Sequence, residues 1–343
     1  MRGRGTNPAM KRTLWAVLVL APTWWSCAGS PDAVVLETCG NARPAALAAC
    51  IEQRLYVEDL SFVAQERLPG SNHWQLVQTY VHNRLEALGY TVELHQDDGA
   101  VNIIGKRTGA LNPKEEVMVS AHYDHIQGCA GADDNGSGVA AALEIARVLA
   151  SADFDRTTTV AFWDLEEVGL VGSAAYARRA RWRGEKIIMN YVLETMGFAS
   201  DEPGSQKIPT GFDVVYPRQV AQVEANENRG DFLTMVADPS ANPAVALLET
   251  FAQAVDLPAI TLRTAQVSLP FTKDLRRSDH QSFWNMGYPA MMLTDGANFR
   301  NPGYHCLERA DTVDTLNHPF SVKIARAVAF AAATQAGMPG LQR

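Results

Sequence analysis

Residues 117–138 read VMVSAHYDHIQGCAGADDNGSG, and this stretch decides the fold. It begins with five apolar or small residues, the pattern of a buried strand, and histidines and acids follow directly. The acidic, glycine-rich segment 131–138 then leads into an apolar-periodic run that predicts a long helix over residues 135–150. A strand, a polar loop and a helix in this order are typical of a parallel sheet covered by helices.

The same alternation continues in both directions along the chain. Further strands are expected at 91–95, 101–106, 158–165, 187–193, 232–237 and 289–294. Further helices are expected at 43–60, 72–88, 171–181, 243–255 and 319–333. The polar segment 199–228 is expected to form loops. We therefore predict an α/β fold, a single domain on a mainly parallel, mixed sheet with helices on both faces and a site at the C-terminal ends of its strands.

Composition and charge exclude several classes of protein. The chain has 343 residues, of which 47% are hydrophobic and 20% charged, so it can build a full core and is not globally disordered. Its formal net charge is −8, and nucleic acid is not expected as a partner because phosphate binding requires clustered Lys and Arg. The length fits one large domain with an appendage.

The N-terminus has the pattern of an export signal. Basic residues within 1–12 precede an apolar run at 13–21, which is shorter than the roughly 20 residues that a membrane-spanning helix needs. We expect residues 1–28 to be a signal peptide and the protein to be exported, either to the periplasm or out of the cell. Cys27 is a candidate for a lipid anchor, with ordinary cleavage after Ala28 as the alternative.

Three polar clusters follow predicted strands. They are HYDH at 122–125, GADDNGSG at 131–138 and DLEE at 164–167. Each cluster alone has an ordinary explanation, such as a structural histidine, a helix N-cap or a solvated turn. Because the strand ends converge, however, the acids would repel one another unless a cation lies between them. Glu194 and His305 follow two more predicted strands, and this mixture of nitrogen and oxygen donors suits zinc.

Charge counting favours two zinc ions. Three carboxylates and one hydroxide balance four positive charges, while histidines serve as neutral ligands. The expected ligands are His122, Asp133, Glu167, Glu194 and His305. Glu166 is then left uncoordinated beside the ions, where a general base is needed. Asp124 is well placed to accept the second ring N–H of His122.

The ordered string of motifs resembles the co-catalytic di-zinc exopeptidases, a family that includes secreted bacterial aminopeptidases and glutamate carboxypeptidase. The resemblance covers roughly residues 60 to 335. The matching segments are AHYDH (121–125), GADDNGSGVAAALEIAR (131–147), FWDLEEVGLVGS (162–173), SDHQSFWNMGYPAMMLTDGANFRNPGYH (278–305), ADTVDTL (310–316) and, more weakly, RLPGSNHW (67–74). It implies a single zinc-exopeptidase domain that hydrolyses peptides.

The resemblance also implies a role for each site residue. One zinc would take His122, Asp133 and Glu194, and the other would take Asp133, Glu167 and His305, so that Asp133 bridges the two ions. Many relatives carry Asp at this position. Glu194 keeps the charge of that Asp and has a longer side chain. Glu166 matches the general base that takes a proton from the bridging water. Tyr304 matches a tyrosine that polarises the scissile carbonyl in some relatives.

The activity implied is that of an aminopeptidase, with three alternatives. A carboxypeptidase on the same scaffold needs a cation for the terminal carboxylate, for which Arg300 is a candidate, although an ordinary structural loop contact is the preferred interpretation of this residue. A glutaminyl cyclase uses one zinc, and such relatives lack the first-motif histidine that His122 supplies here. A non-catalytic ectodomain is not expected, because each candidate position carries a competent donor.

We therefore expect three parts along the chain: the signal at 1–28, a helical, disulfide-bearing extension at 29–60 and the catalytic domain at 61–338. Without Cys27, four cysteines remain, an even number that fits an oxidising compartment. They are Cys39, Cys50, Cys129 and Cys306. The first two flank a short loop that one disulfide can close. The last two, each beside a predicted ligand, either form a second bridge or remain two buried thiols.

Overall fold

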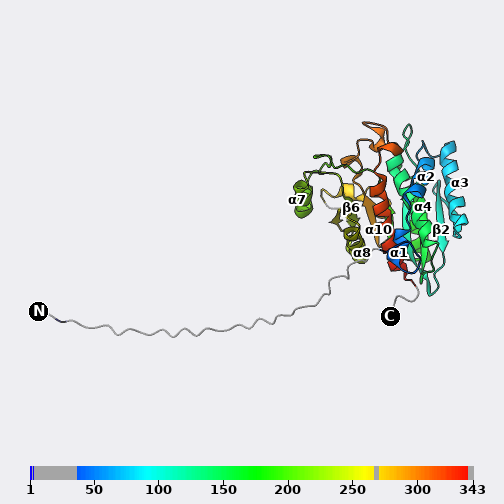
Figure 1. Cartoon of the computed structure of the whole chain (residues 1–343), viewed down its shortest axis with the longest axis horizontal. Coiled ribbons are helices and arrows are strands. Elements are labelled where there is room, and N and C mark those ends of the chain that lie inside the picture. Colours follow the sequence, from blue (N-terminus) through cyan, green and yellow to red (C-terminus); the bar gives the residue numbers. More distant parts are fainter. Residues whose placement is uncertain (2, 4–36, 266–269, 339–343) are drawn as a thin grey trace. The chain divides into compact units, whose positions relative to one another are not determined.

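The computed structural model describes residues 37–265 and 270–338, together with Met1 and Gly3 (Figure 1). The expected signal peptide and Cys27 therefore lie outside the described residues, apart from those two positions. All the helices and strands described belong to one compact unit, Ala33–Arg343. Among the described residues, no helix combines the length and the apolar composition needed to cross a membrane.

The centre of the fold is an eight-stranded mixed sheet. Its strand order is β1-β2-β4-β3-β5-β8-β6-β7. The strands are β1 (Thr91–Asp97), β2 (Ala100–Arg107), β3 (Asn112–His122), β4 (Arg156–Trp163), β5 (Lys186–Leu193), β6 (Leu233–Ala237), β7 (Ala259–Arg263) and β8 (Ala290–Thr294). The β4/β3, β3/β5, β5/β8 and β6/β7 pairs are parallel, whereas β1/β2, β2/β4 and β8/β6 are antiparallel. The predicted mixed, mainly parallel sheet is confirmed.

Successive residues of these apolar strands point to opposite sides of the sheet, so both of its faces are apolar. Helices cover both faces. Val119 of β3 and Phe162 of β4 belong to the larger core, under α1, α2, α3, α4, α8 and α10. Their neighbours Met118 and Trp163 belong to a second core, under α5, α7 and α9. The helices are α1 (Pro44–Ala49), α2 (Gln53–Val63), α3 (Asn72–Ala87), α4 (Gly138–Leu149), α5 (Val171–Arg183), α6 (Phe212–Val215), α7 (Pro217–Ala225), α8 (Asn242–Ala254), α9 (His280–Asn285) and α10 (His318–Ala336). Figure 1 shows α4, α8 and α10 on one face of the sheet.

The helix predicted over 43–60 is two helices, α1 and α2. The chain leaves the helical conformation at Glu52, whose φ is −108° and ψ is 121°. The N–H of Glu52 donates to the buried carboxylate of Glu144 on α4, at 2.7 Å, so a tertiary contact replaces the helical hydrogen bond. Both helices contribute to the larger core, and the predicted boundary between residues 60 and 61 falls within α2.

One strand and three α-helices are absent from the sequence-based prediction: β7, α6, α7 and α9. Strand β7 is only five residues long and lies at the edge of the sheet. Helix α7 lies in the segment predicted to be loop, and Pro217 occupies its first turn, where a missing N–H costs nothing. Val220 and Val223 then repeat at helical spacing and are buried, which is the signal that could have revealed this helix.

Candidate metal centre

Three neighbouring parallel strands bring polar side chains together at one edge of the sheet. His122 is the last residue of β3 and lies in register with Trp163, the last residue of β4. Glu194 directly follows β5, and Glu166 and Glu167 lie in the turn after β4. The strand order β4-β3-β5 therefore gathers side chains that are far apart along the chain.

The carboxylate between the two predicted histidine ligands belongs to Asp134. Its Oδ1 lies 3.3 Å from His122 Nε2, and its Oδ2 lies 3.1 Å from His305 Nε2. On the first side, Glu194 Oε2 lies 3.4 Å from His122 Nε2. On the second side, Glu167 Oε2 lies 3.2 Å from His305 Nε2. The donors thus form two groups that share one carboxylate, an arrangement suited to two ions.

The prediction that Asp133 supplies this shared carboxylate is wrong by one residue. Asp133 instead accepts hydrogen bonds of 2.7 Å from the backbone N–H of Gly197 and from the side chain of Asn301. Asp134 has an extended backbone (φ −103°, ψ 102°), and adjacent residues in an extended segment project to opposite sides. Burial and the nearby Asp295 raise the pKa of Asp133 well above its usual value, and its hydrogen bonds to Gly197 and Asn301 give it a structural role.

Asp124 holds the backbone of the glutamate pair. Its Oδ1 accepts the N–H of Glu166 at 3.0 Å, and its Oδ2 accepts the N–H of Glu167 at 3.2 Å. The same Oδ1 lies 3.4 Å from His122 Nδ1, on the side predicted from the sequence. Asp124 is completely buried, so one carboxylate orients two glutamates and one histidine of the site.

Glu166 lies with the first group of donors. Ligand atoms of His122, Glu166 and Glu194 all lie within 4.8 Å of one another. Burial raises the pKa of Glu166 well above its usual value, and His122 opposes this shift. The carboxylate faces the cavity that adjoins the site, where it can exchange a proton with a bound molecule.

His125 is a donor that the sequence analysis did not assign. Its Nδ1 lies 2.7 Å from Glu167 Oε1, and its ring meets the ring of His305 edge-on. Ligand atoms of His125, Asp134 and Glu167 also lie within 4.8 Å of one another. The segment HYDH contains two histidines, and the position of His125 three residues after His122 could have marked it as part of the site.

Three buried polar atoms of the site have no hydrogen-bond partner among the described residues, and a bound cation would satisfy them. His122 Nε2, His305 Nε2 and Asp134 Oδ1 are buried without a hydrogen-bond partner. Burial opposes the charged form of His305, but the carboxylates of Asp134 and Glu167 outweigh it and raise the pKa to about 10. The acids around His122 likewise raise its pKa well above the usual value against burial. A cluster that draws positive charge onto its histidines, with nitrogen and oxygen donors, fits zinc.

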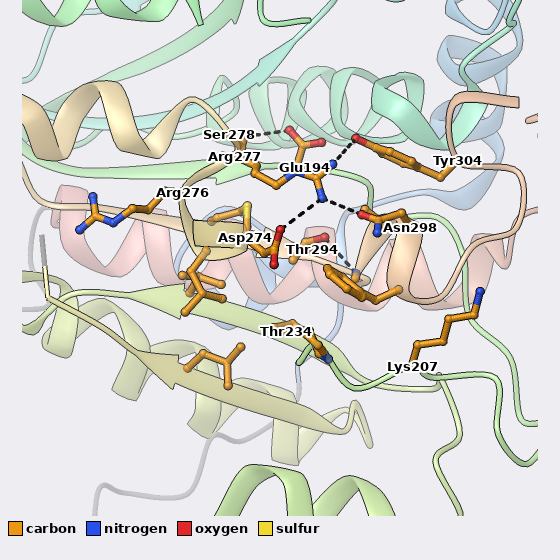
Figure 2. Close-up of a pocket in the computed structure, with 18 of the residues that line it drawn as sticks. Glu194, Lys207, Thr234, Asp274, Arg276, Arg277, Ser278, Thr294, Asn298 and Tyr304 are labelled. Carbon is orange, nitrogen blue, oxygen red and sulfur yellow. Dashed lines mark hydrogen bonds and ion pairs between the residues drawn. The ribbon is translucent and has the colours of Figure 1, made fainter. Parts of the chain in front are cut away.

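A cavity of about 420 Å³ opens beside the two donor groups (Figure 2). Glu166, Glu167, Glu194 and His305 form part of its wall. The far part of the wall is apolar and includes residues from β6, β7, α6, α7 and β8. These residues are Phe212, Tyr216, Val220, Val223, Phe232, Val236, Ile260, Leu262 and Met292. The cavity therefore joins a charged site to an apolar chamber of the size that binds small ligands.

Tyr304 lies at the mouth of this cavity, where Arg277 holds it (Figure 2). Its ring stacks on His305 with 4.0 Å between the ring centroids. Its hydroxyl oxygen accepts a hydrogen bond of 3.0 Å from Arg277 Nη2, so the hydroxyl hydrogen remains available for another acceptor. Ser278, the next residue, donates to Glu194 at 2.8 Å. One short segment thus orients two residues of the site.

Arg300, the candidate for binding a terminal carboxylate, makes structural contacts. It is buried, donates through Nε to Gln206 at 2.8 Å and packs over the ring of Phe232 at 4.5 Å. Burial lowers its pKa to about 10, and Asp295 opposes that shift. The ordinary loop role is the one that the geometry supports.

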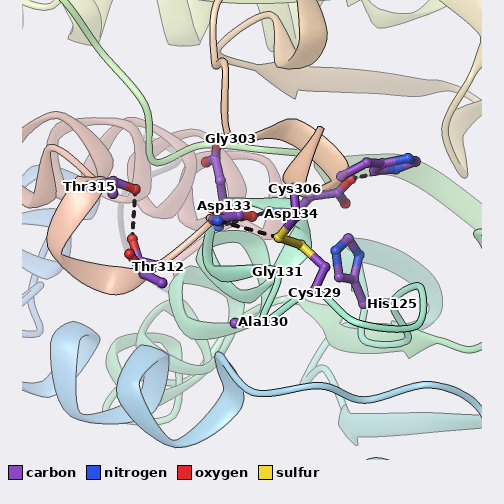
Figure 3. The surroundings of a disulfide bond; sticks show 12 residues. His125, Cys129, Ala130, Gly131, Asp133, Asp134, Gly303, Cys306, Thr312 and Thr315 are labelled. Carbon is purple, nitrogen blue, oxygen red and sulfur yellow. Dashed lines mark hydrogen bonds and ion pairs between the residues drawn. A yellow bond between two sulfur atoms is a disulfide. The ribbon is translucent and has the colours of Figure 1, made fainter. Parts of the chain in front are cut away.

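Both pairs of cysteines form disulfides. Cys39 and Cys50 close a local loop, with 4.6 Å between their Cα atoms. Cys129 and Cys306 join loops that are 177 residues apart in sequence, with 5.7 Å between their Cα atoms (Figure 3). The second bridge ties the loop that carries Asp134 to the loop that carries His305. Disulfides of this kind fit a protein that works in an oxidising compartment.

Removing the long-range disulfide is expected to cost more stability than removing the local one. Replacing both Cys129 and Cys306 by Ser should lower the free energy of unfolding by about 2–4 kcal/mol, because the bridge restricts the unfolded chain over a long loop. The matched control is the same double replacement at Cys39 and Cys50, whose loop is far shorter. Denaturant unfolding of the three proteins measures both differences, and an equal or larger loss in the control would contradict the expectation.

Fold and site together define a class of protein: an α/β protein with two groups of histidine and carboxylate donors beside an apolar cavity. The family model described as Peptidase family M28 matches residues 102–332, more than half of the chain. The chain therefore belongs to peptidase family M28.

Three known proteins show how far the similarity extends. The protein YfbL of Escherichia coli K12 is 30% identical over 217 residues, which cover 59% of this chain and 61% of YfbL. An aminopeptidase of Pseudomonas aeruginosa PAO1 is 43% identical over 133 residues, which cover 34% of this chain and 25% of that protein. The chain thus spans less than two thirds of either relative. The crystal structure of the LapA aminopeptidase of Legionella pneumophila has the same fold, with a TM-score of 0.63 at 18% identity, over 84% of this chain and 72% of that chain.

Proposed function

We propose that this protein is a zinc-dependent exopeptidase of the aminopeptidase type that holds two zinc ions. The observation that carries the proposal is the Asp134 carboxylate between His122 and His305, with Glu166 beside it. His122, Asp134 and Glu194 would hold one ion, and Asp134, Glu167 and His305 the other. When bound, zinc supplies a Lewis acid and lowers the pKa of a coordinated water.

The residues of the chain supply the proton transfers and the orientation of the substrate. Glu166 accepts the proton of the attacking water at its carboxylate and passes it to the nitrogen of the leaving amine. Tyr304 donates its free hydroxyl hydrogen to the substrate carbonyl oxygen as negative charge develops there, while Arg277 holds the tyrosine oxygen from the other side. Asp124 keeps Glu166 in position through its backbone N–H.

The acidity of the site supports the choice of an aminopeptidase. Glu166 and Glu194 face the cavity at the point where the reacting bond must lie, and they attract a free ammonium group. Among the described residues, the cations that line the cavity are Lys207, Arg276, Arg277 and His305. Arg277 donates to Tyr304 and Asn298, which favours a role in orienting Tyr304 over one in binding a terminal carboxylate.

A panel of model peptides tests the proposed activity on the zinc-loaded protein. A leucyl peptide with a free N-terminus should be cleaved, and its N-acetylated form should resist cleavage. An N-blocked peptide with a free C-terminus reports a carboxypeptidase, and a peptide with N-terminal glutamine reports cyclisation to pyroglutamate. Preferential turnover of either of the last two substrates would replace the aminopeptidase assignment with that activity.

We also propose that the protein is exported, with residues 1–28 as its signal peptide, either anchored through Cys27 or free. The segment 29–60 would precede residues 61–338 along the chain, with α1 and the first part of α2 packed into the core of the catalytic domain, and peptides would be the substrates. The two disulfides support export, because they persist in oxidising compartments. Mass spectrometry of the mature N-terminus, isolated from its host, separates a lipidated Cys27 from simple cleavage.

The apolar chamber is expected to select bulky apolar side chains at the N-terminal position of the substrate. A charged side chain would lose its hydration there, so leucyl and phenylalanyl substrates should exceed aspartyl or lysyl ones in kcat/KM by about 10–200-fold. Val220→Asp should lower kcat/KM for the leucyl substrate, because Val220 lines the cavity. Val214→Asp is the control, because Val214 is 71% exposed and lies outside the lining. Equal rates for all side chains would contradict the expectation.

Replacing His122 by Ala should remove one zinc and leave the other. The second group keeps Asp134, Glu167 and His305, whose donor atoms do not depend on the lost imidazole. Metal analysis after dialysis should fall from about two ions per chain to about one. His82→Ala should keep both ions, because this half-buried imidazole of α3 lies next to Glu86 and belongs to neither donor group. Unchanged stoichiometry in His122→Ala would contradict the two-site assignment.

A further inference from the structure

Arg67 is a fully buried cation whose described hydrogen bonds all end on backbone carbonyl oxygens. It lies between α2 and α3, and its exposed fraction is 0%. Nε, Nη1 and Nη2 all donate hydrogen bonds, so each nitrogen of the guanidinium is used. A charge buried in this way is costly unless its partners are held in fixed positions. The cost suggests a purpose beyond filling space.

Four of the six carbonyl groups that Arg67 contacts belong to the two loops that carry the site, and the other two, of Val63 and Gln65, are local. Nε donates at 2.9 Å to the carbonyl oxygen of Tyr123, the residue after His122. Nη1 donates at 2.6 Å to the carbonyl oxygen of Ala130, and Nη2 donates to those of Gly131 at 2.7 Å and Asp134 at 3.0 Å. One planar group therefore sets the spacing between loop 122–125 and loop 129–134.

Asp311 holds the second loop from the amide side. Its carboxylate accepts the backbone N–H of Asp133 at 2.9 Å and that of Asp134 at 3.1 Å. The carbonyl oxygens of the loop thus bond to a cation, and its N–H groups bond to an anion. Asp134, whose side chain lies between the two site histidines, has its N–H on Asp311 and its carbonyl oxygen on Arg67.

The two loops approach each other so closely at Gly131 that a side chain there would clash with His125. A Cβ atom on Gly131 would lie 2.4 Å from the ring of His125 and 2.3 Å from the carbonyl oxygen of Asp134. Gly131 also has φ +57°, a conformation that favours glycine. No side chain can therefore stand at this point, and the distance between the loops depends on the groups that bond to their backbones.

We propose that Arg67 and Asp311 are positioning residues that clamp the peptide groups of loop 129–134 and thereby set the affinity of the site for metal. The inference rests on the proposed function, because it assumes that Asp134 binds both ions. Arg67 lies outside residues 102–332, the range of the family match. Outer partners that orient metal ligands typically change metal affinity or activity by about 10–100-fold when they are replaced.

Arg67→Lys provides the sharpest test, because it keeps the charge and loses the planar fork of donors. Zinc dissociation constants should be measured on the metal-free protein by competition with a chromophoric chelator. We expect affinity for at least one ion to weaken by about 10–100-fold, and kcat at saturating zinc to fall while KM stays close to the wild-type value. Arg147→Lys is the matched control, because Arg147 donates to the carbonyl oxygen of Cys50 on the far side of α4.

Asp311→Asn tests the same clamp from the other side and serves if Arg67→Lys does not fold. Its amide nitrogen cannot accept a backbone N–H, so the variant should also weaken zinc binding. Near-UV circular dichroism of the metal-free proteins shows whether each variant keeps native packing. A folded Arg67→Lys or Asp311→Asn with wild-type zinc affinity would overturn the clamp. Failure of the wild-type protein to bind zinc would instead overturn the proposed function.

Discussion

Glu166→Gln is expected to lower kcat by about 10²–10⁴-fold while the zinc content stays close to that of the wild-type protein. The amide has the same shape but cannot accept the proton of the attacking water. Glu166 lies beside His122 and Glu194, and in the proposed assignment it is not a zinc ligand, so its carboxylate is left to accept a proton. Steady-state kinetics and metal analysis on the same preparation measure both quantities.

The neighbouring glutamate supplies the control for this experiment. Glu167 has an oxygen 3.2 Å from His305 Nε2, so Glu167→Gln should lose zinc as well as activity. The two variants differ by one position and remove the same charge. A Glu166→Gln protein with near-normal kcat and full zinc content would show that another group accepts the proton.

Asp134→Asn is expected to abolish most activity and most zinc binding. Its carboxylate is shared by both donor groups, with one oxygen near each histidine. An amide has only one oxygen, so it cannot serve both groups. Metal-assisted stabilisation supplies several kcal/mol at the transition state, so its loss should lower kcat/KM by about 10³-fold or more. Metal analysis after dialysis and kinetics at saturating zinc separate weak binding from weak catalysis.

Asp133→Asn provides the contrast that decides between the two adjacent aspartates. Burial already favours the neutral form of Asp133, and its partners lie on the side of the loop away from the histidines. An amide nitrogen at this position would face one of the two N–H donors, Gly197 or Asn301, so the variant should lose some stability. It should nevertheless keep both ions, because the carboxylate between the two histidines is that of Asp134. The opposite result, with zinc lost in Asp133→Asn and kept in Asp134→Asn, would restore Asp133 to the bridging position.

The sequence predicted the main features of the fold because they depend on local patterns. Apolar runs such as 117–121 form strands wherever both of their faces are covered, and the helix at Gly138–Leu149 follows its loop as its periodicity requires. The break at Glu52 and the edge strand β7 were not predictable in this way. The first depends on Glu144, which is 92 residues away, and the second on pairing with β6.

What the sequence by itself determined about this protein is the set of side chains and the strand end that carries each of them. The structure brings together side chains that the motifs singled out: His122, Glu166, Glu167, Glu194 and His305. Only the tertiary structure decided which of two adjacent aspartates faces the histidines. A sequence pattern cannot distinguish Asp133 from Asp134, because that choice depends on backbone dihedral angles set by distant partners. Arg67 and Asp311 hold those peptide groups, and each lies more than 60 residues from the loop along the chain.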